Sequence, residues 1–144
     1  MTVSQALEKL SAYEKLMFTY NHASGLMYYD GATVAPRGSA DLRADTLGEL
    51  ARLSYALTTA PETVEMLRTL VEARDRLDPV TARKVSELWR DYEMTHRVPE
   101  EEFVAYQQLT SKADAVWHEA KERSDFALFE PYLQQVCLLY TSDA

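Results

Sequence analysis

Residues that interrupt helices, cross-link a chain or span a membrane are scarce in this sequence. Four glycines and five prolines make 9 of its 144 residues, about half the usual share of these two types. So few turn-forming residues predict few, long elements, which favours helices. The single cysteine, Cys137, excludes a disulfide within the chain and indicates a reducing compartment. No run of about 18 apolar residues is present, so no transmembrane helix is predicted.

Basic residues are also in the minority, with 15 Lys and Arg against 23 Asp and Glu and a formal charge of −8. This balance argues against a protein whose main partner is nucleic acid or an anionic membrane. The first ten residues mix charged and apolar side chains and lack the apolar core of a signal peptide. We therefore predict a soluble, cytoplasmic protein. Its length corresponds to one domain of ordinary size.

Apolar residues recur with helical spacing along most of the chain. Steps of four and three residues alternate in the first segment and predict a helix of about 40 Å over residues 3–29. The members of this seam are Ala6, Leu10, Tyr13, Met17, Tyr20, Ser24 and Met27. Further helices are predicted over residues 40–58, from 61 to about 74, from 79 to about 97 and from 99 to about 122, with a sixth element after Ser124. No strand-like alternation or internal repeat is present. The sequence therefore predicts an all-α fold of long antiparallel helical hairpins.

Local signals predict where these helices begin. The segment Asp30–Gly38 is the one clear loop, and Ser39 is expected to cap the helix that follows it. Thr59 is expected to cap the next helix, which has a proline in its first turn. Asp78 directly precedes another proline, an arrangement typical of a helix start. Pro99 opens the fifth helix, and the three glutamates after it complement the positive end of the helix dipole.

The three histidines do not have the spacing of a metal site. No two of His22, His96 and His118 lie one turn apart on a helix. His118 and Glu119 resemble the start of the zinc-binding motif HExxH, but Glu122 stands where the second histidine would be. One histidine and one glutamate supply at most two ligands, whereas catalytic zinc sites use three protein ligands. We expect this pair on a solvated helix face, with Glu119 bound to the arginine four residues further on.

Other residues that could carry chemistry have simpler structural interpretations. Cys137 has no histidine nearby in the sequence, so it is not predicted to be a nucleophile. Trp89 and Trp117 occupy apolar helix faces and are expected in the core, with His96 at its edge. Residues 91–130 hold ten carboxylates against four basic groups, which we interpret as a solvated face. Taken alone, the residues favour an interaction or scaffold domain over a catalyst.

Two motifs in the chain resemble a known family. The first runs from Tyr29 to Gly38, Tyr-Asp-Gly-Ala-Thr-Val-Ala-Pro-Arg-Gly, and is followed by Arg43 and Leu47. The second is the string Asp-Phe-x-x-Phe-x-Pro-x-Leu over Asp125–Leu133. In this order and spacing they resemble the N-terminal pattern of the carboxypeptidase Taq family, thermostable HExxH metallocarboxypeptidases. The resemblance covers about residues 3–136, and Tyr29 departs from the tryptophan that the family often has there.

The resemblance implies a gluzincin-like, neurolysin-like helical peptidase fold. Full-length members are much longer, form homodimers and release single amino acids from the C-termini of peptides with broad specificity. They hold zinc or cobalt with the two histidines of HExxH and a downstream glutamate, while the glutamate of the motif activates water. All of these residues would lie beyond Ala144. Residues 1–136 would then be the N-terminal helical region, with no catalytic residue, no metal ligand, no bound zinc and no activity of their own.

The family-motif residues within this stretch are expected to be structural or to line the substrate groove. They are Tyr29, Asp30, Thr33, Pro36 and Arg43. The alternative hypothesis is a free-standing helical protein-interaction domain without catalysis. The coding sequence beyond Ala144 distinguishes the two, because only the enzyme requires HExxH and a glutamate-bearing helix downstream.

Residues 137–144 depart from the helical pattern and end without a C-cap glycine or a polar tail. They are either a short helix docked on the core or a segment foreign to the protein, since they resemble translated sequencing adapter. If the chain is a fragment, helix faces that evolved to pack on a larger body would be exposed to solvent. The positions expected to be exposed are Leu10, Met17, Met27, Phe129 and Leu133.

Overall fold

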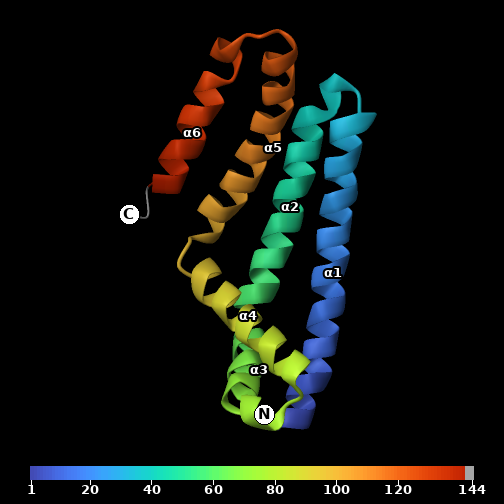
Figure 1. Cartoon of the computed structure of the whole chain (residues 1–144), viewed down its shortest axis with the longest axis vertical. Helices are drawn as coiled ribbons and strands as arrows, with labels where there is room; N and C mark the ends of the chain where they lie inside the picture. Colours follow the sequence, from blue (N-terminus) through green and yellow to red (C-terminus); the bar gives the residue numbers. More distant parts are fainter. Residues whose placement is uncertain (142–144) are drawn as a thin grey trace. The chain divides into compact units, whose positions relative to one another are not determined.

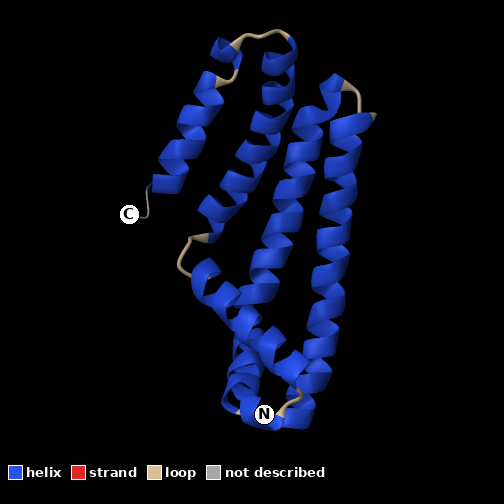
Figure 2. Ribbon diagram, in the orientation of Figure 1, coloured by secondary structure: helices blue, strands red, loops and turns tan. Residues whose placement is uncertain are grey.

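Helices are the regular elements of this structure. The computed structural model describes residues 1–141, apart from the side chains of Arg37, Tyr140 and Thr141, and it contains no strand within them (Figures 1 and 2). The α-helices are α1 (Val3–Thr33), α2 (Ala40–Thr59), α3 (Pro61–Glu72), α4 (Pro79–Thr95), α5 (Glu100–Glu122) and α6 (Glu130–Thr141). Short 3-10 helices lie at Arg37–Ser39, Arg74–Arg76 and Phe126–Leu128. The prediction of an all-α fold is confirmed.

Two predicted helix boundaries are wrong, and threonines explain both. The expected loop Asp30–Gly38 begins too early, because α1 continues to Thr33. The hydroxyl of Thr33 donates to the carbonyl oxygen one turn back at 2.6 Å. Thr59 is the last residue of α2 rather than the cap of α3; its hydroxyl donates to the carbonyl oxygen of Tyr55 at 2.8 Å, and Ala60 takes the cap position. In each case the hydroxyl of the threonine bonds to a carbonyl oxygen one turn earlier, in the helix that ends at this threonine.

The predicted starts of α4 and α5 are confirmed. The carboxylate of Asp78 accepts hydrogen bonds from the backbone N–H groups of Val80 and Thr81, both at 3.1 Å. Hydrogen bonding to Thr81, through its side chain and its backbone, holds the pKa of Asp78 below its usual value. Pro99 occupies the cap position of α5, and the three glutamates that follow fill the first turn.

The helices form two compact units, each built from two separate stretches of chain. Unit 1 consists of Met1–Asn21 and Leu53–Val98, and unit 2 consists of His22–Arg52 and Pro99–Ala144. The long helices α1 and α2 therefore each contribute one part to unit 1 and the other part to unit 2.

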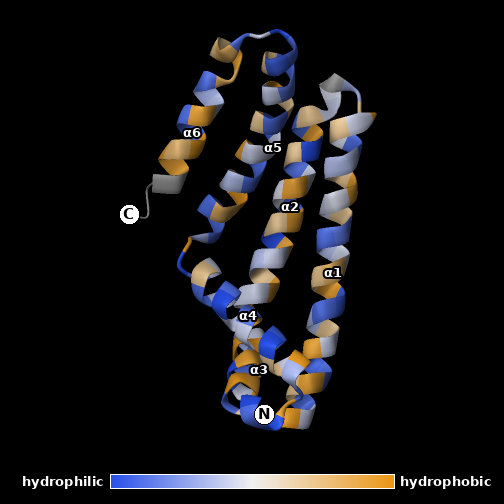
Figure 3. Ribbon diagram, in the orientation of Figure 1, coloured by the Kyte–Doolittle hydropathy of each residue, from blue (hydrophilic) through white to orange (hydrophobic). Residues whose placement is uncertain are grey.

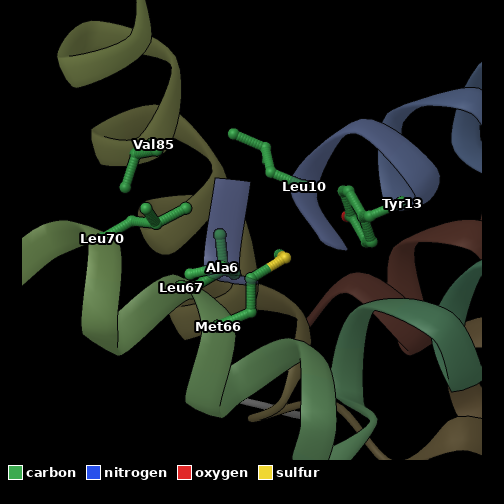
Figure 4. Packing of buried hydrophobic residues seen from close by; sticks show 7 residues of the cluster. All are labelled: Ala6, Leu10, Tyr13, Met66, Leu67, Leu70 and Val85. Atoms are coloured by element: carbon green, nitrogen blue, oxygen red, sulfur yellow. The ribbon is translucent and has the colours of Figure 1, made fainter. Parts of the chain in front are cut away.

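The hydrophobic core of unit 1 joins α1, α3 and α4 (Figure 4). Its buried members are Ala6, Leu10 and Tyr13 of α1, Met66, Leu67 and Leu70 of α3, and Val85 of α4. The α1 residues are the first three members of the predicted seam. Leu10 is only 4% exposed, so the expectation that it would be exposed is wrong. That expectation considered only α2 as a partner for α1, whereas α3 and α4 cover this end of the helix.

The phenol of Tyr13 is a polar group buried in the same core. The hydroxyl of Tyr13 lies 3.4 Å from Oγ1 of Thr58, which satisfies a group that would otherwise be costly to bury. Burial raises the pKa of the Tyr13 phenol, since the charged form would lose its hydration. Trp89, which was expected in the core, packs against this cluster while remaining partly exposed.

Small residues let α2 and α5 approach closely in unit 2. A β-carbon at Gly48 of α2 would lie 2.6 Å from Nε2 and 2.7 Å from Cγ of Gln108 on α5. Ala44 and Ala113 are buried on the same two helices. Two ion pairs connect these helices, Arg52–Glu100 at 2.8 Å and Lys112–Asp41 at 3.3 Å.

Of the other four side chains that were expected to be exposed to solvent, one is exposed and three are half-buried. Leu133 is 39% exposed, as expected, whereas Met17, Met27 and Phe129 are half-buried. Trp117 was expected in the core but is also 39% exposed. It lies on the same stripe of α5 as two buried alanines, and its larger ring extends beyond them into solvent.

Large hydrophobic side chains are exposed at positions that the sequence did not single out. They include Phe18, Leu26, Leu42 and Phe126, which are between 57% and 72% exposed, and Figure 3 shows hydrophobic residues along every helix. No helix among residues 1–141 has both the length and the apolar character needed to cross a membrane. Helix α6 continues through residues 137–141, and the rest of the off-pattern tail lies outside the described residues.

Candidate functional site

The five family-motif residues lie around the connection between α1 and α2, within unit 2. Tyr29, Asp30 and Thr33 belong to the last turns of α1, Pro36 lies in the connection, and Arg43 is in the first turns of α2. The carbonyl oxygen of Asp30 accepts hydrogen bonds from the N–H groups of the two residues after Thr33, at 3.0 and 2.9 Å. These bonds close the C-terminus of α1 and turn the chain towards α2.

Arg43 fastens this connection. Its Nη1 donates to the hydroxyl of Ser39 at 3.2 Å, and that hydroxyl donates to the carbonyl oxygen of Pro36 at 2.7 Å. The hydroxyl of Ser39 thus bonds to Arg43 and Pro36 and not to a backbone N–H group of α2. The prediction that Ser39 caps α2 is therefore wrong. A β-carbon at position 31 would lie 2.6 Å from Nε of Arg43. A larger residue at position 31 would therefore displace the guanidinium group from its place against α1.

The structure brings only part of the motif together. Pro36 and Arg43 share the contacts around Ser39, and Thr33 and Asp30 act through the last turn of α1. The ring of Tyr29 is 69% exposed and takes no part in the connection. Gly31 and Ser39 contact Arg43, although the sequence did not predict either contact. A glycine within a helical pattern, beside a motif that contains arginine, was the available signal for Gly31.

Arg43 lines several cavities in unit 2, and two of these are also lined by Asp114. The first, of about 500 Å³, lies between α1, α2 and α5, and Arg43 and Asp114 are its only charged lining residues. The second, of about 350 Å³, is lined by the same two residues and also by His118, Glu119 and Glu122 of α5. Arg43 is half-buried, and among the described residues no carboxylate lies within ion-pair distance of it.

The acidic and histidine residues beside these cavities do not fit a catalytic metal centre. Within residues 1–141 no group of three or more His, Cys, Asp or Glu side chains could hold a metal ion. Nε2 of His118 lies 3.9 Å from Oδ2 of Asp114, and Glu119 forms the predicted pair with Arg123 at 2.9 Å. His96 belongs to unit 1, where it stacks on Tyr92 with ring centroids 4.8 Å apart. A catalytic zinc site requires three protein ligands.

The arrangement around Arg43 is instead suited to binding a charged group. It offers a guanidinium group with unused N–H donors, and it contains no nucleophile with an adjacent general base of the kind used in covalent catalysis.

Comparisons with known proteins identify the family of this helical chain. The family model for carboxypeptidase Taq (M32) metallopeptidase matches residues 9–144. The chain belongs to this family. Among curated relatives, carboxypeptidase 1 of Bacillus subtilis is 35% identical over 135 residues, which cover 89% of this chain and 27% of the relative. Thermostable carboxypeptidase 1 of Thermus thermophilus is 30% identical over 141 residues, or 96% of this chain and 28% of the relative.

A solved structure agrees with these relatives. The crystal structure described as BsuCP has a TM-score of 0.88 and 32% sequence identity, and the match covers 94% of this chain and 27% of that chain. The chain therefore spans about a quarter of the length of the metallocarboxypeptidases that it matches.

Proposed function

We propose that this chain is the N-terminal helical region of a longer metallocarboxypeptidase that releases amino acids from the C-termini of peptides with broad specificity. The observation that carries the proposal is the family match over residues 9–144, together with the 27–28% share of the relatives that the matched region represents. The names of those relatives support carboxypeptidase activity as the function of the whole protein.

A metallopeptidase requires a metal ion, and we propose zinc or cobalt. Such an ion supplies a polarised water and charge stabilisation when bound. The described residues of this chain do not provide its ligands, so the ligands and the general base belong to the remaining polypeptide. Residues 1–136 supply helical scaffold, and the 144-residue stretch alone is inactive and binds no catalytic metal.

The proposed contribution of this region is to hold one wall of the substrate groove. Arg43, Ser39 and Pro36 fix the connection between α1 and α2, which gives that wall a rigid edge. The large exposed side chains, such as Phe18 and Leu42, would be covered by the remaining polypeptide or by a second subunit of a homodimer. The compartment that we propose is the cytoplasm.

Reading the coding sequence beyond Ala144 and assaying the encoded full-length protein tests this proposal. We expect HExxH and a downstream glutamate-bearing helix in the sequence. We also expect stepwise release of C-terminal residues from a peptide, followed by mass spectrometry, and no release from the same peptide with a C-terminal amide. A genuine stop codon after Ala144 would contradict the proposal and favour a free-standing interaction domain.

A further inference from the structure

The larger of the two cavities that Arg43 and Asp114 both line has the chemistry of a small-molecule binding site. We call it the Arg43 cavity; Ser24 and Tyr28 of α1, Arg43 and Leu47 of α2, and Thr110 and Asp114 of α5 are among its lining residues. Its volume of about 500 Å³ lies within the range of pockets that hold small ligands. All of its lining residues belong to unit 2.

Arg43 provides a positive charge that forms no direct ion pair with a described carboxylate. Nη1 donates to Ser39 at 3.2 Å, and the guanidinium group has further N–H donors that no described residue accepts. Partial burial of an unpaired charge is unfavourable. Carboxylate and phosphate groups match the planar fork of an arginine, and the carboxylate of Asp114 in the same cavity disfavours a multiply charged phosphate.

Asp114 provides the opposite charge in the same cavity. Its side chain is 40% exposed, and the nearest basic group, Nε2 of His118, lies 3.9 Å away. Arg43 and Asp114 line both cavities, yet they do not pair with each other. Two opposite charges that face one cavity without touching leave room for a ligand that carries both.

We propose that the Arg43 cavity binds a free α-amino acid in its zwitterionic form. The carboxylate binds the guanidinium group of Arg43, and the ammonium group binds the carboxylate of Asp114. The hydroxyl of Thr110 donates to the carbonyl oxygen of Tyr106 at 2.9 Å, so its oxygen can accept a hydrogen bond from the ammonium group. The hydroxyl of Ser24 also lines the cavity, and Leu47 offers apolar surface to an aliphatic side chain. Because the two charged groups of the ligand are attached to one carbon atom, this arrangement discriminates against compounds that lack either charge.

Binding at this site is separate from peptide hydrolysis. If the proposed function is correct, free amino acids are the product of the enzyme, and the cavity would sense product; that consequence rests on the proposed function. The binding itself does not. Hydrogen exchange reports the site and amino-acid release reports the activity, so failure of one is distinguishable from failure of the other.

The test is hydrogen–deuterium exchange with mass spectrometry on the full-length protein, titrated with leucine. We expect slower exchange in peptides that cover residues 24–47 and 107–114. Leucinamide, which lacks the carboxylate, and N-acetyl-leucine, which lacks the ammonium group, should each protect these segments at least about tenfold more weakly.

Two variants and two matched controls test whether the charged side chains of Arg43 and Asp114 bind leucine. Arg43→Gln and the nearly isosteric Asp114→Asn should each raise the leucine concentration needed for half-maximal protection at least about tenfold. Arg52→Gln, on the same helix but paired with Glu100, and Asp45→Asn, on the exposed side of α2, should leave it unchanged. Asp114→Asn keeps the test decisive if Arg43→Gln fails to fold.

Three results would overturn the proposal. The first is the absence of leucine protection in both segments. The second is equal protection by N-acetyl-leucine or leucinamide. The third is an effect of Asp114→Asn no larger than that of Asp45→Asn.

Discussion

Two helical glycines in unit 2 provide a matched test of the packing between α2 and α5. Gly25 lies within α1, and a β-carbon there would meet no atom within 4 Å. Gly48 is buried within α2, where a β-carbon would lie 2.6, 2.7 and 2.9 Å from Nε2, Cγ and Cδ of Gln108. The same substitution, to alanine, should therefore have opposite effects at the two positions.

The magnitudes follow from two opposing contributions. Alanine in place of glycine in a helix interior raises the free energy of unfolding by about 0.5–1 kcal/mol, and Gly25→Ala should show this gain in full. At Gly48 the β-carbon overlaps Cγ as well as the end of the Gln108 side chain, so the whole side chain must move. An off-rotamer side chain costs about 0.5–1.5 kcal/mol and overpacking about 1–3 kcal/mol. Gly48→Ala should therefore be destabilising by as much as about 2 kcal/mol.

Urea unfolding of the 144-residue chain, followed by circular dichroism, measures both variants. The background Gln108→Ala removes the atoms that the new β-carbon would meet, so Gly48→Ala should become stabilising there. The coupling energy between positions 48 and 108 should reach at least about 1 kcal/mol. If Gly48→Ala stabilises the chain as much as Gly25→Ala does, with no coupling to Gln108, the close approach of α2 and α5 is refuted.

Three further predictions concern unit 1. Leu70→Ala should lower the free energy of unfolding by about 2–5 kcal/mol, because Leu70 is fully buried and its loss leaves a cavity; a change below about 1 kcal/mol would contradict the assigned core. Asp78→Ala should destabilise the chain at neutral pH, and the difference should shrink as the pH falls below about 4. The direction of this pH dependence follows from the lowered pKa of Asp78. The folded state favours the carboxylate, so Asp78 contributes to the free energy of unfolding above its unfolded pKa, and this contribution is lost as the carboxylate is protonated. An unchanged difference at pH 3 would argue against the cap. Tyr13→Phe should cost about 0.5–1.5 kcal/mol through loss of the contact with Thr58, and in the native chain Tyr13 should ionise above its usual value of about 10 in an absorbance titration; a phenol that ionises at or below that value would contradict its burial.

The sequence predicted the positions of the helices better than it predicted which helices pack against one another. The spacing of Ala6, Leu10 and Tyr13 correctly identified the buried face of α1, and the side chain of Asp78 correctly marked the start of α4. Periodicity does not state which helix covers that face, so the burial of Leu10 by α3 and α4 was missed. The hydroxyl of Thr59 could bond forwards or backwards along the chain, and only the folded backbone decides between them.

The candidate site was predicted in part. Resemblance to the family pointed to Arg43 and Pro36, which meet around Ser39 in the structure. Asp114 was not identified, because it lies on α5, far from Arg43 in the sequence, and only the packing of unit 2 places both beside one cavity. An aspartate in the middle of an amphipathic helix carries no local signal for such a role.

We propose above all that residues 1–136 are the non-catalytic, N-terminal helical region of a longer metallocarboxypeptidase. Metal content and amino-acid release, measured side by side for the full-length protein and the 144-residue chain, test it most directly. We expect stoichiometric metal and release of C-terminal residues for the full-length protein, and neither for the 144-residue chain when its circular dichroism confirms a helical fold. Stoichiometric zinc in the 144-residue chain after dialysis, lost on His118→Ala and accompanied by peptide hydrolysis, would contradict it.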